Sequence, residues 1–148
     1  MGFLDFWKNE KARIEPSDSQ LDLLNQSQEL APPRKRVDGA IVFRRFTDAI
    51  QDNGGDEDAY KQAVITETDE LFGCGVRELY KATGGKPNRR ETLPHEVQQA
   101  YIANETLSTY ELERLRGTIG GESQDEVNDK IDAVVREQSR KTRRYLPW

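Results

Sequence analysis

The stretch Leu71–Arg90, LFGCGVRELYKATGGKPNRR, places a short helical pattern between glycines and ends in basic residues. Apolar positions within Val76–Tyr80 share one face of a helix. Gly73 stands where the preceding helix would end and Gly84-Gly85 where this one would, because glycine adopts the helix-terminating left-handed conformation at little cost. Pro87 then prevents the helix from continuing. We therefore expect this stretch to be a helix-and-turn unit within a helical domain.

The same helical pattern extends along the chain in both directions. Apolar residues recur at intervals of three and four, Asn53-Gly54-Gly55 and Gly117 interrupt them, and Ser123 with Glu126 forms a capping box. The best candidate for a strand, Ala40–Phe43, is short. We predict an all-α fold, a small helical domain of four to five helices with a flexible N-terminal arm. The expected helices pass through Val42–Ile50, run from Asp56 to Gly73, pass through Val76–Tyr80, run from Pro94 to Leu115, and run from Ser123 to Val135.

Two parts of the chain differ in character. Residues 1–36 form the expected arm, and residues 37–148 form the expected helical domain with an aromatic C-terminal tail. Polar residues dominate most of the arm, and Pro32-Pro33 favours extended backbone before the domain begins. A capping-box pattern at Ser17 and Gln20 is compatible with one short helix inside the arm, which would be marginal alone.

Composition limits the classes of function. The 148 residues are about one domain long, and 34% hydrophobic with 33% charged residues predicts a modest core inside a solvated shell. A formal net charge of −5 argues against a general nucleic-acid binder. A single cysteine excludes intramolecular disulfides and multi-cysteine metal sites and indicates a reducing, cytoplasmic setting. No apolar run approaches the roughly 20 residues that span a bilayer, so we expect a soluble protein.

Basic residues between positions 77 and 90 form a candidate nucleic-acid or partner-binding surface. They are Arg77, Lys81, Lys86, Arg89 and Arg90. Arg77 and Lys81 are four residues apart and share a helix face, while the loop that follows offers side-chain and backbone donors to phosphates. The alternative is an ordinary solvated surface, which the acidic residues directly before this stretch favour.

Two aromatic clusters near the chain ends are candidate docking sites for a partner. They consist of Phe3, Phe6 and Trp7, and of Tyr145 and Trp148. Trp, Tyr and Arg commonly dominate binding energy at interfaces, whereas the alternative for both clusters is packing onto the helical core. We favour packing for the C-terminal tail and partner binding for the N-terminal cluster, which a polar stretch separates from the domain.

No arrangement of residues indicates catalysis. Nucleophilic chemistry would need a base beside Cys74, and the only histidine is His95. Paired Cys or His spacings typical of metal sites are absent, and Gly84-Gly85-Lys86 lacks the spacer and the Ser/Thr of a phosphate-binding loop. We therefore expect a non-enzyme without catalytic residues, metal or cofactor.

A series of short motifs follows the same order as in a known family. The motifs are Ile65-Thr66, Leu71-Phe72-Gly73, Glu78-Leu79-Tyr80-Lys81, Gly85-Lys86-Pro87, Leu93, Gln99-Ala100, Asn104, Thr109, Glu111, Leu115-Arg116 and Val135-Arg136. In this order, residues 65–136 resemble the C-terminal region of the DNA-damage-inducible protein D family. The resemblance implies a role around DNA damage or recombination, through binding a nucleoprotein partner rather than through catalysis.

Two functional hypotheses follow. The first is a non-enzymatic regulatory protein that docks on a protein or nucleoprotein complex in a DNA-damage or DNA-metabolism context. The alternative is direct nucleic-acid binding through the basic 77–90 segment.

Overall fold

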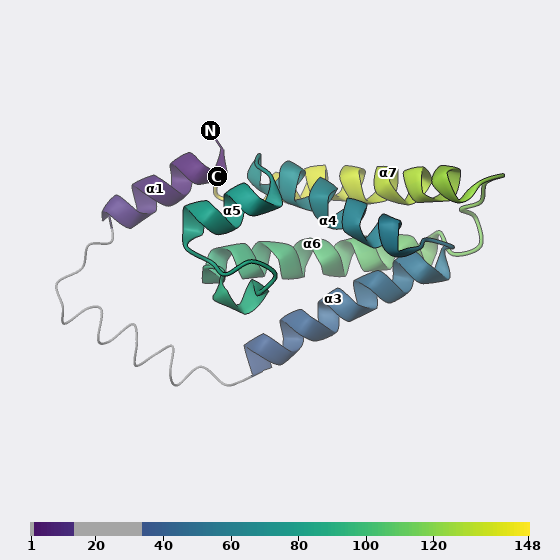
Figure 1. Cartoon of the computed structure of the whole chain (residues 1–148), viewed down its shortest axis with the longest axis horizontal. Coiled ribbons are helices and arrows are strands. Elements are labelled where there is room, and N and C mark those ends of the chain that lie inside the picture. The colour runs from purple at the N-terminus through teal and green to yellow at the C-terminus, as the bar shows by residue number, and fades with distance from the viewer. Residues whose placement is uncertain (1, 14–33) are drawn as a thin grey trace.

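The computed structural model describes residues 2–13 and 34–148, and every regular element among them is helical. The expected all-α class is therefore confirmed for these residues, and their six α-helices exceed the four to five expected. The helix considered at Ser17 lies outside the described residues. The elements, coloured along the chain in Figure 1, are α1 (Phe3–Arg13), α3 (Arg34–Asp52), α4 (Glu57–Phe72), α5 (Val76–Thr83), the 3-10 turn η1 (Arg90–Thr92), α6 (His95–Arg114) and α7 (Gln124–Arg143).

Local signals in the sequence define both ends of α4, the end of α5 and the start of α7. The Asp56 side chain accepts a hydrogen bond from the Ala59 N–H at the start of α4, and the Ser123 hydroxyl accepts one from Glu126 at the start of α7. Gly73 and Gly84 end α4 and α5 in the left-handed conformation, with φ of 69° and 74°. The ends predicted from these residues are confirmed.

Four helices, α3, α4, α6 and α7, form a bundle in which successive helices alternate in direction. Helix α4 lies along α7, α3 along α6, and α6 along α7. Helices α3 and α4 meet at their connecting turn and then diverge, as Figure 1 shows. Within residues 2–13 and 34–148, the bundle is therefore closed on three sides and open on the fourth, between α3 and α4.

The turn between α3 and α4 is bonded to the bundle and closely packed. Asn53 ties it to the bundle, because its Nδ2 donates to the carbonyls of Ala49 and Leu112, each at 2.9 Å. Gly55 is required there, since a Cβ would stand 2.5 Å from Ile50 Cγ2 and 2.9 Å from Ile131 Cδ1.

Two apolar cores occupy the two ends of the bundle, and buried polar residues separate them. The first core, here the aromatic core, comprises Phe3, Leu71, Phe72, Cys74, Leu79, Tyr80, Leu93, Val97, Ala100, Tyr101 and Trp148. The second core comprises Phe46, Ala49, Ile50, Ala59, Ala63, Leu112, Ile131 and Val135. The residues between them, here the polar layer, are Thr66, Glu67, Thr68, Asn104, Glu105, Ser108, Thr109, Ser139 and Thr142. Such a layer is stable only if hydrogen bonds and charge pairs compensate its burial.

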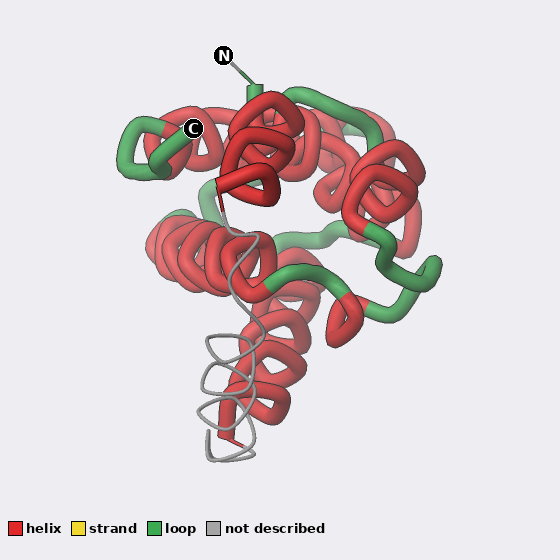
Figure 2. The backbone as a smooth tube through the Cα atoms, turned by 90° about the vertical axis from the view of Figure 1, so that its left-hand side faces the viewer, coloured by secondary structure: helices red, strands yellow, loops and turns green. Residues whose placement is uncertain are grey.

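The beginning of the chain differs from the arm expected over residues 1–36. Residues 3–13 form α1, which packs on α4 and α5 and buries Phe3 completely. The expected arm is therefore corrected for these residues, because Phe3 packs against Phe72 and Trp148 in the aromatic core. The two chain ends lie side by side in Figures 1 and 2. Among the described helices, none has the length and apolar character needed to cross a bilayer.

Candidate functional site

A groove of about 900 Å³ lies at the open side of the bundle. Its walls come from α3, α4, α5, α6 and the loop around η1. The groove is open to solvent, because several of its lining residues are exposed, among them Ala40, Ile65 and Asn88. Its volume is near the top of the roughly 300–1,000 Å³ typical of ligand pockets, so it has room for several side chains of a bound molecule.

Apolar side chains from four helices line most of this groove. Phe43 comes from α3, Val64 and Ile65 from α4, Val76 from α5 and Ile102 from α6. Ile65 is 51% exposed. Scattered exposed apolar residues are normal on proteins, but a concave group of them from four elements is typical of an interaction site.

Arg90 brings a positive charge to the wall of the groove. Its guanidinium carbon lies 4.4 Å from the centre of the Phe43 ring and 4.2 Å from the centre of the Tyr101 ring, a distance at which aromatic faces attract cations. Its Nη1 donates to both carboxylate oxygens of Glu105 at 2.8 Å. Its Nη2 is 3.8 Å from Glu67 Oε2. The Arg90 side chain is 28% exposed, whereas both carboxylates are fully buried.

A tightly bonded loop holds Arg90 in this position. The Thr92 hydroxyl accepts from the Lys86 N–H at 2.8 Å and donates to the Arg89 carbonyl at 2.6 Å. Gly85 leaves no space for a side chain, because a Cβ would stand 3.0 Å from Tyr80 Cδ1. The loop is therefore compact, and Arg90 enters the bundle rather than extending into solvent.

Two buried carboxyl groups share this one cation, and their pKa values differ from ordinary glutamates. Burial, and then the charge of Glu105, raise the pKa of Glu67 well above its usual value. Burial also raises the pKa of Glu105, although Arg90 opposes that effect. Burial alone would lower the pKa of Arg90, but the carboxylates of Glu105 and Glu67 outweigh it and raise the pKa. The distances agree with a charged Arg90–Glu105 pair beside a neutral Glu67 carboxylic acid.

Hydrogen bonds extend the cluster into the polar layer. The Asn104 amide donates to Glu67 Oε1 at 3.1 Å and to Ser139 Oγ at 3.0 Å. The hydroxyls of Thr68 and Tyr101 are 2.7 Å apart, which fixes the ring under the Arg90 guanidinium. The polar layer thus holds one face of the groove in place from inside the bundle.

The structure divides the five predicted basic residues into two groups. Arg77, Lys81, Lys86 and Arg89 are exposed, and none of them forms an ion pair with another described residue. Arg77 also lines the groove. Arg90 is neutralised by buried carboxylates, so its assignment as a cation available to phosphates is wrong. The sequence could not show this because both carboxylates come from other helices.

The structure also separates the terminal aromatic residues. Phe3 and Trp148 are buried, with ring centres 4.8 Å apart, and the Trp148 indole N–H donates to the Leu71 carbonyl at 2.7 Å. Both are therefore core residues: Trp148 packs as favoured for the C-terminal tail, whereas the assignment of Phe3 as a docking anchor is corrected. Phe6 and Trp7 are half-buried against the same core. Tyr145 is 88% exposed and stays a candidate contact residue.

The two residues considered for nucleophilic catalysis have different environments. Cys74 is buried in the aromatic core, and burial together with Glu78 and Asp69 raises its thiol pKa to about 11. A reactive thiolate needs the opposite shift. His95 is exposed at the start of α6. Within the described residues, no group of three or more His, Cys, Asp or Glu side chains is placed to hold a metal ion.

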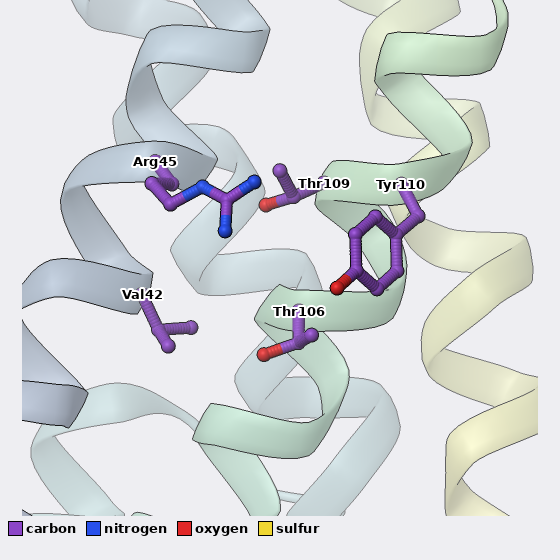
Figure 3. A pocket seen from close by; sticks show the side chains of 5 residues that line it. All are labelled: Val42, Arg45, Thr106, Thr109 and Tyr110. Atoms are coloured by element: carbon purple, nitrogen blue, oxygen red, sulfur yellow. The ribbon is translucent and has the colours of Figure 1, made fainter.

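A second depression, between α3 and α6, is far smaller. Figure 3 shows Val42 and Arg45 of α3 facing Thr106, Thr109 and Tyr110 of α6. It holds only about 20 Å³, roughly the space of one water molecule. The groove is therefore the stronger candidate site.

Glu67 and Glu105 are the site residues that sequence reasoning missed. A signal exists, because Glu67 lies four residues after Ala63 and Glu105 four residues after Tyr101, on helix faces that are otherwise buried. A charged residue within a core-facing stripe indicates a buried partner, although the sequence does not identify that partner as Arg90.

Comparisons with known proteins give no relative for this chain: no protein-family model, curated protein or solved structure matches it. The resemblance to the DNA-damage-inducible protein D family stays a prediction.

Proposed function

We propose that this protein is a cytoplasmic, non-enzymatic interaction protein that docks on a protein or nucleoprotein partner through the α3–α4 groove. The observation that carries the proposal is the groove itself, an open apolar concavity of about 900 Å³ between helices that the bundle leaves apart. Docking by a protein segment would bury Ile65 and the surrounding apolar surface. Burial of apolar surface is the main favourable contribution to the free energy of protein association.

The setting proposed for this docking is DNA damage or DNA metabolism, and it rests on the family resemblance of residues 65–136. That range supplies parts of α4, α5, η1 and α6, all of which line the groove. The state of Cys74 also agrees with docking rather than nucleophilic catalysis. Its thiol is buried in the core and has a raised pKa, so it is a poor nucleophile.

A comparison of two equally exposed isoleucines tests the docking site. Ile41 and Ile65 are each 51% exposed, but only Ile65 lines the groove. Proteins captured from a lysate by wild type should be lost with Ile65→Asp and retained with Ile41→Asp. Quantitative mass spectrometry measures the difference, and circular dichroism checks that both variants stay helical. Equal capture by the two variants would refute docking in the groove.

Direct nucleic-acid binding is the second candidate, favoured by the four exposed cations of α5 and the loop. Reversing Lys81, Lys86 and Arg89 to Glu tests it while leaving the structural Arg90 intact. If these residues contact phosphates, affinity for duplex DNA should fall, and the salt slope should become shallower by about 0.9 per lost contact. Binding that is undetectable in wild type, or unchanged in the variant, excludes this candidate.

A further inference from the structure

The groove has features that restrict what can occupy it. Among the described residues, α3 and α4 make few contacts with each other, and the groove lies between them. On the α3 wall, Gly39 lies against Ile102 of α6, because a Cβ at Gly39 would stand 3.7 Å from Ile102 Cδ1, whereas Ala40 is small and exposed. Apolar side chains of α4, Val64 and Ile65, line the groove as well. An amphipathic helix that presents one apolar face fits this arrangement better than an extended strand, because no sheet edge among the described residues offers backbone partners.

Charge is distributed unevenly around the groove. Residues 76–92, which form its α5 and η1 wall, carry five basic residues against two acidic ones, Glu78 and Glu91, although the whole chain has a net charge of −5. Arg90 is already paired with Glu105, but Arg77 lines the groove without an ion pair to any described residue. Lys61 on the α4 wall pairs only with exposed Glu57. The edge of the groove therefore attracts negative charge, while its interior favours apolar groups.

From these observations we propose that the occupant of the groove is an acidic amphipathic α-helix of a partner protein. This inference rests on the proposed docking function and adds the chemistry of the partner. Apolar side chains of the helix at i, i+3 or i+4, and i+7 pack on Phe43, Val64, Ile65 and Ile102, and its carboxylates face Arg77. The helix lies along the open side of the bundle as an additional helix.

Nucleic acid is a poorer occupant than an acidic helix, although both carry negative charge. A phosphate backbone needs donors and cations along its length, whereas most of the lining is aliphatic or aromatic carbon. Of the cations that line the groove, Arg90 is already paired with Glu105 and Lys61 with Glu57, which leaves too few for a phosphate backbone. A protein helix gains from both features, since apolar anchors fill the interior and a few carboxylates meet the basic edge.

Selection from a random peptide library tests the chemistry of the occupant directly. The probe is a yeast-displayed library of 16-residue peptides with Glu, Gln and Lys encoded equally, sorted for binding to the full chain. Binders that also bind Ile65→Asp are discarded, whereas those that bind Ile41→Asp are kept. We expect the remaining peptides to combine helical apolar spacing with an excess of Glu over Lys. Absence of any peptide that depends on Ile65 would overturn groove docking itself. Peptides that depend on Ile65 but lack an excess of Glu would overturn only the acidic-helix assignment.

A charge reversal with a matched control completes the test. Arg77→Glu should weaken binding of a selected acidic peptide by roughly three- to tenfold, because it replaces an attraction with a repulsion at the groove edge. Arg116→Glu changes an exposed arginine outside the groove and should leave affinity unchanged. Fluorescence anisotropy at two salt concentrations measures both. Equal affinity of wild type and Arg77→Glu would contradict the proposal, as would tighter binding of duplex DNA than of any selected peptide. Self-association that disappears with Ile65→Asp would instead identify the occupant as a second copy of this chain.

Discussion

The aromatic core and the polar layer are adjacent in the bundle, and each buries residues whose type is more often found elsewhere. The aromatic core takes Phe3 and Trp148, which resemble docking anchors in the sequence, and buries them against each other. The polar layer takes Glu67 and Glu105, which resemble surface residues, and places them behind the groove with Arg90. Residue type alone therefore gives a poor indication of the functional surface, because the partner that each side chain finds across the bundle decides its role.

The largest effect should come from removing the cation of the polar layer. Arg90→Met leaves two buried carboxyl groups without their positive partner and should lower the free energy of unfolding by about 3–5 kcal/mol. Urea unfolding measures it. Arg89→Met is the control, because Arg89 is the neighbouring residue and its side chain is exposed. It should change the free energy of unfolding by no more than about 0.5 kcal/mol. A loss below about 1 kcal/mol in Arg90→Met would show that the cluster does not depend on its cation.

The aromatic core should respond to loss of volume rather than of charge. Trp148→Ala removes ring contacts with Phe3 and Phe72 and the hydrogen bond to Leu71, and should cost about 3 kcal/mol. Tyr145→Ala, in the same tail but exposed, should have little effect on thermal unfolding. Similar losses in the two variants would mean that Trp148 is not a core residue in solution.

The smallest stability effect concerns the proton on Glu67. The pKa values of Glu67 and Glu105 are raised in the folded state, so the folded protein holds protons that the unfolded chain releases. This contribution to stability is present below the ordinary glutamate pKa of 4.5 and is lost as pH rises through the folded-state values.

Replacing this carboxyl by an amide isolates its effect. Glu67→Gln mimics the neutral form, so its stability should fall less steeply from pH 5 to pH 8. At pH 8 it should equal wild type or exceed it by up to about 1 kcal/mol. Urea midpoints at both pH values measure this difference. An equal pH slope in the two proteins would show that Glu67 is ionised.

Local sequence signals anticipated the helices of the bundle well. The helix start at Asp56 or Glu57, the capping box at Ser123 and the helix ends at Gly73 and Gly84 depend on residues within a few positions of each other, so sequence reasoning found them. The docking of α1 was missed because it depends on Phe3 meeting Trp148, at opposite ends of the chain. The candidate site was missed for a similar reason.

The groove arises from several contacts between residues that are distant in sequence. Phe43 on α3 and Glu105 on α6 both contact Arg90, which belongs to the loop around η1. Only Arg77 was both predicted as a binding residue and found in the groove with an exposed charge. Patterns within single helices do not encode such an arrangement.

Site-specific photo-crosslinking tests most directly whether the partner contacts the groove or the C-terminal tail. A photoreactive phenylalanine analogue replaces either Ile65, in the groove, or Tyr145, the exposed aromatic of the tail. The full chain is then irradiated in a lysate, and crosslinked proteins are identified by mass spectrometry. Docking in the groove predicts a discrete crosslinked partner from position 65 and none from position 145. A partner crosslinked from position 145 but not from position 65 would contradict it.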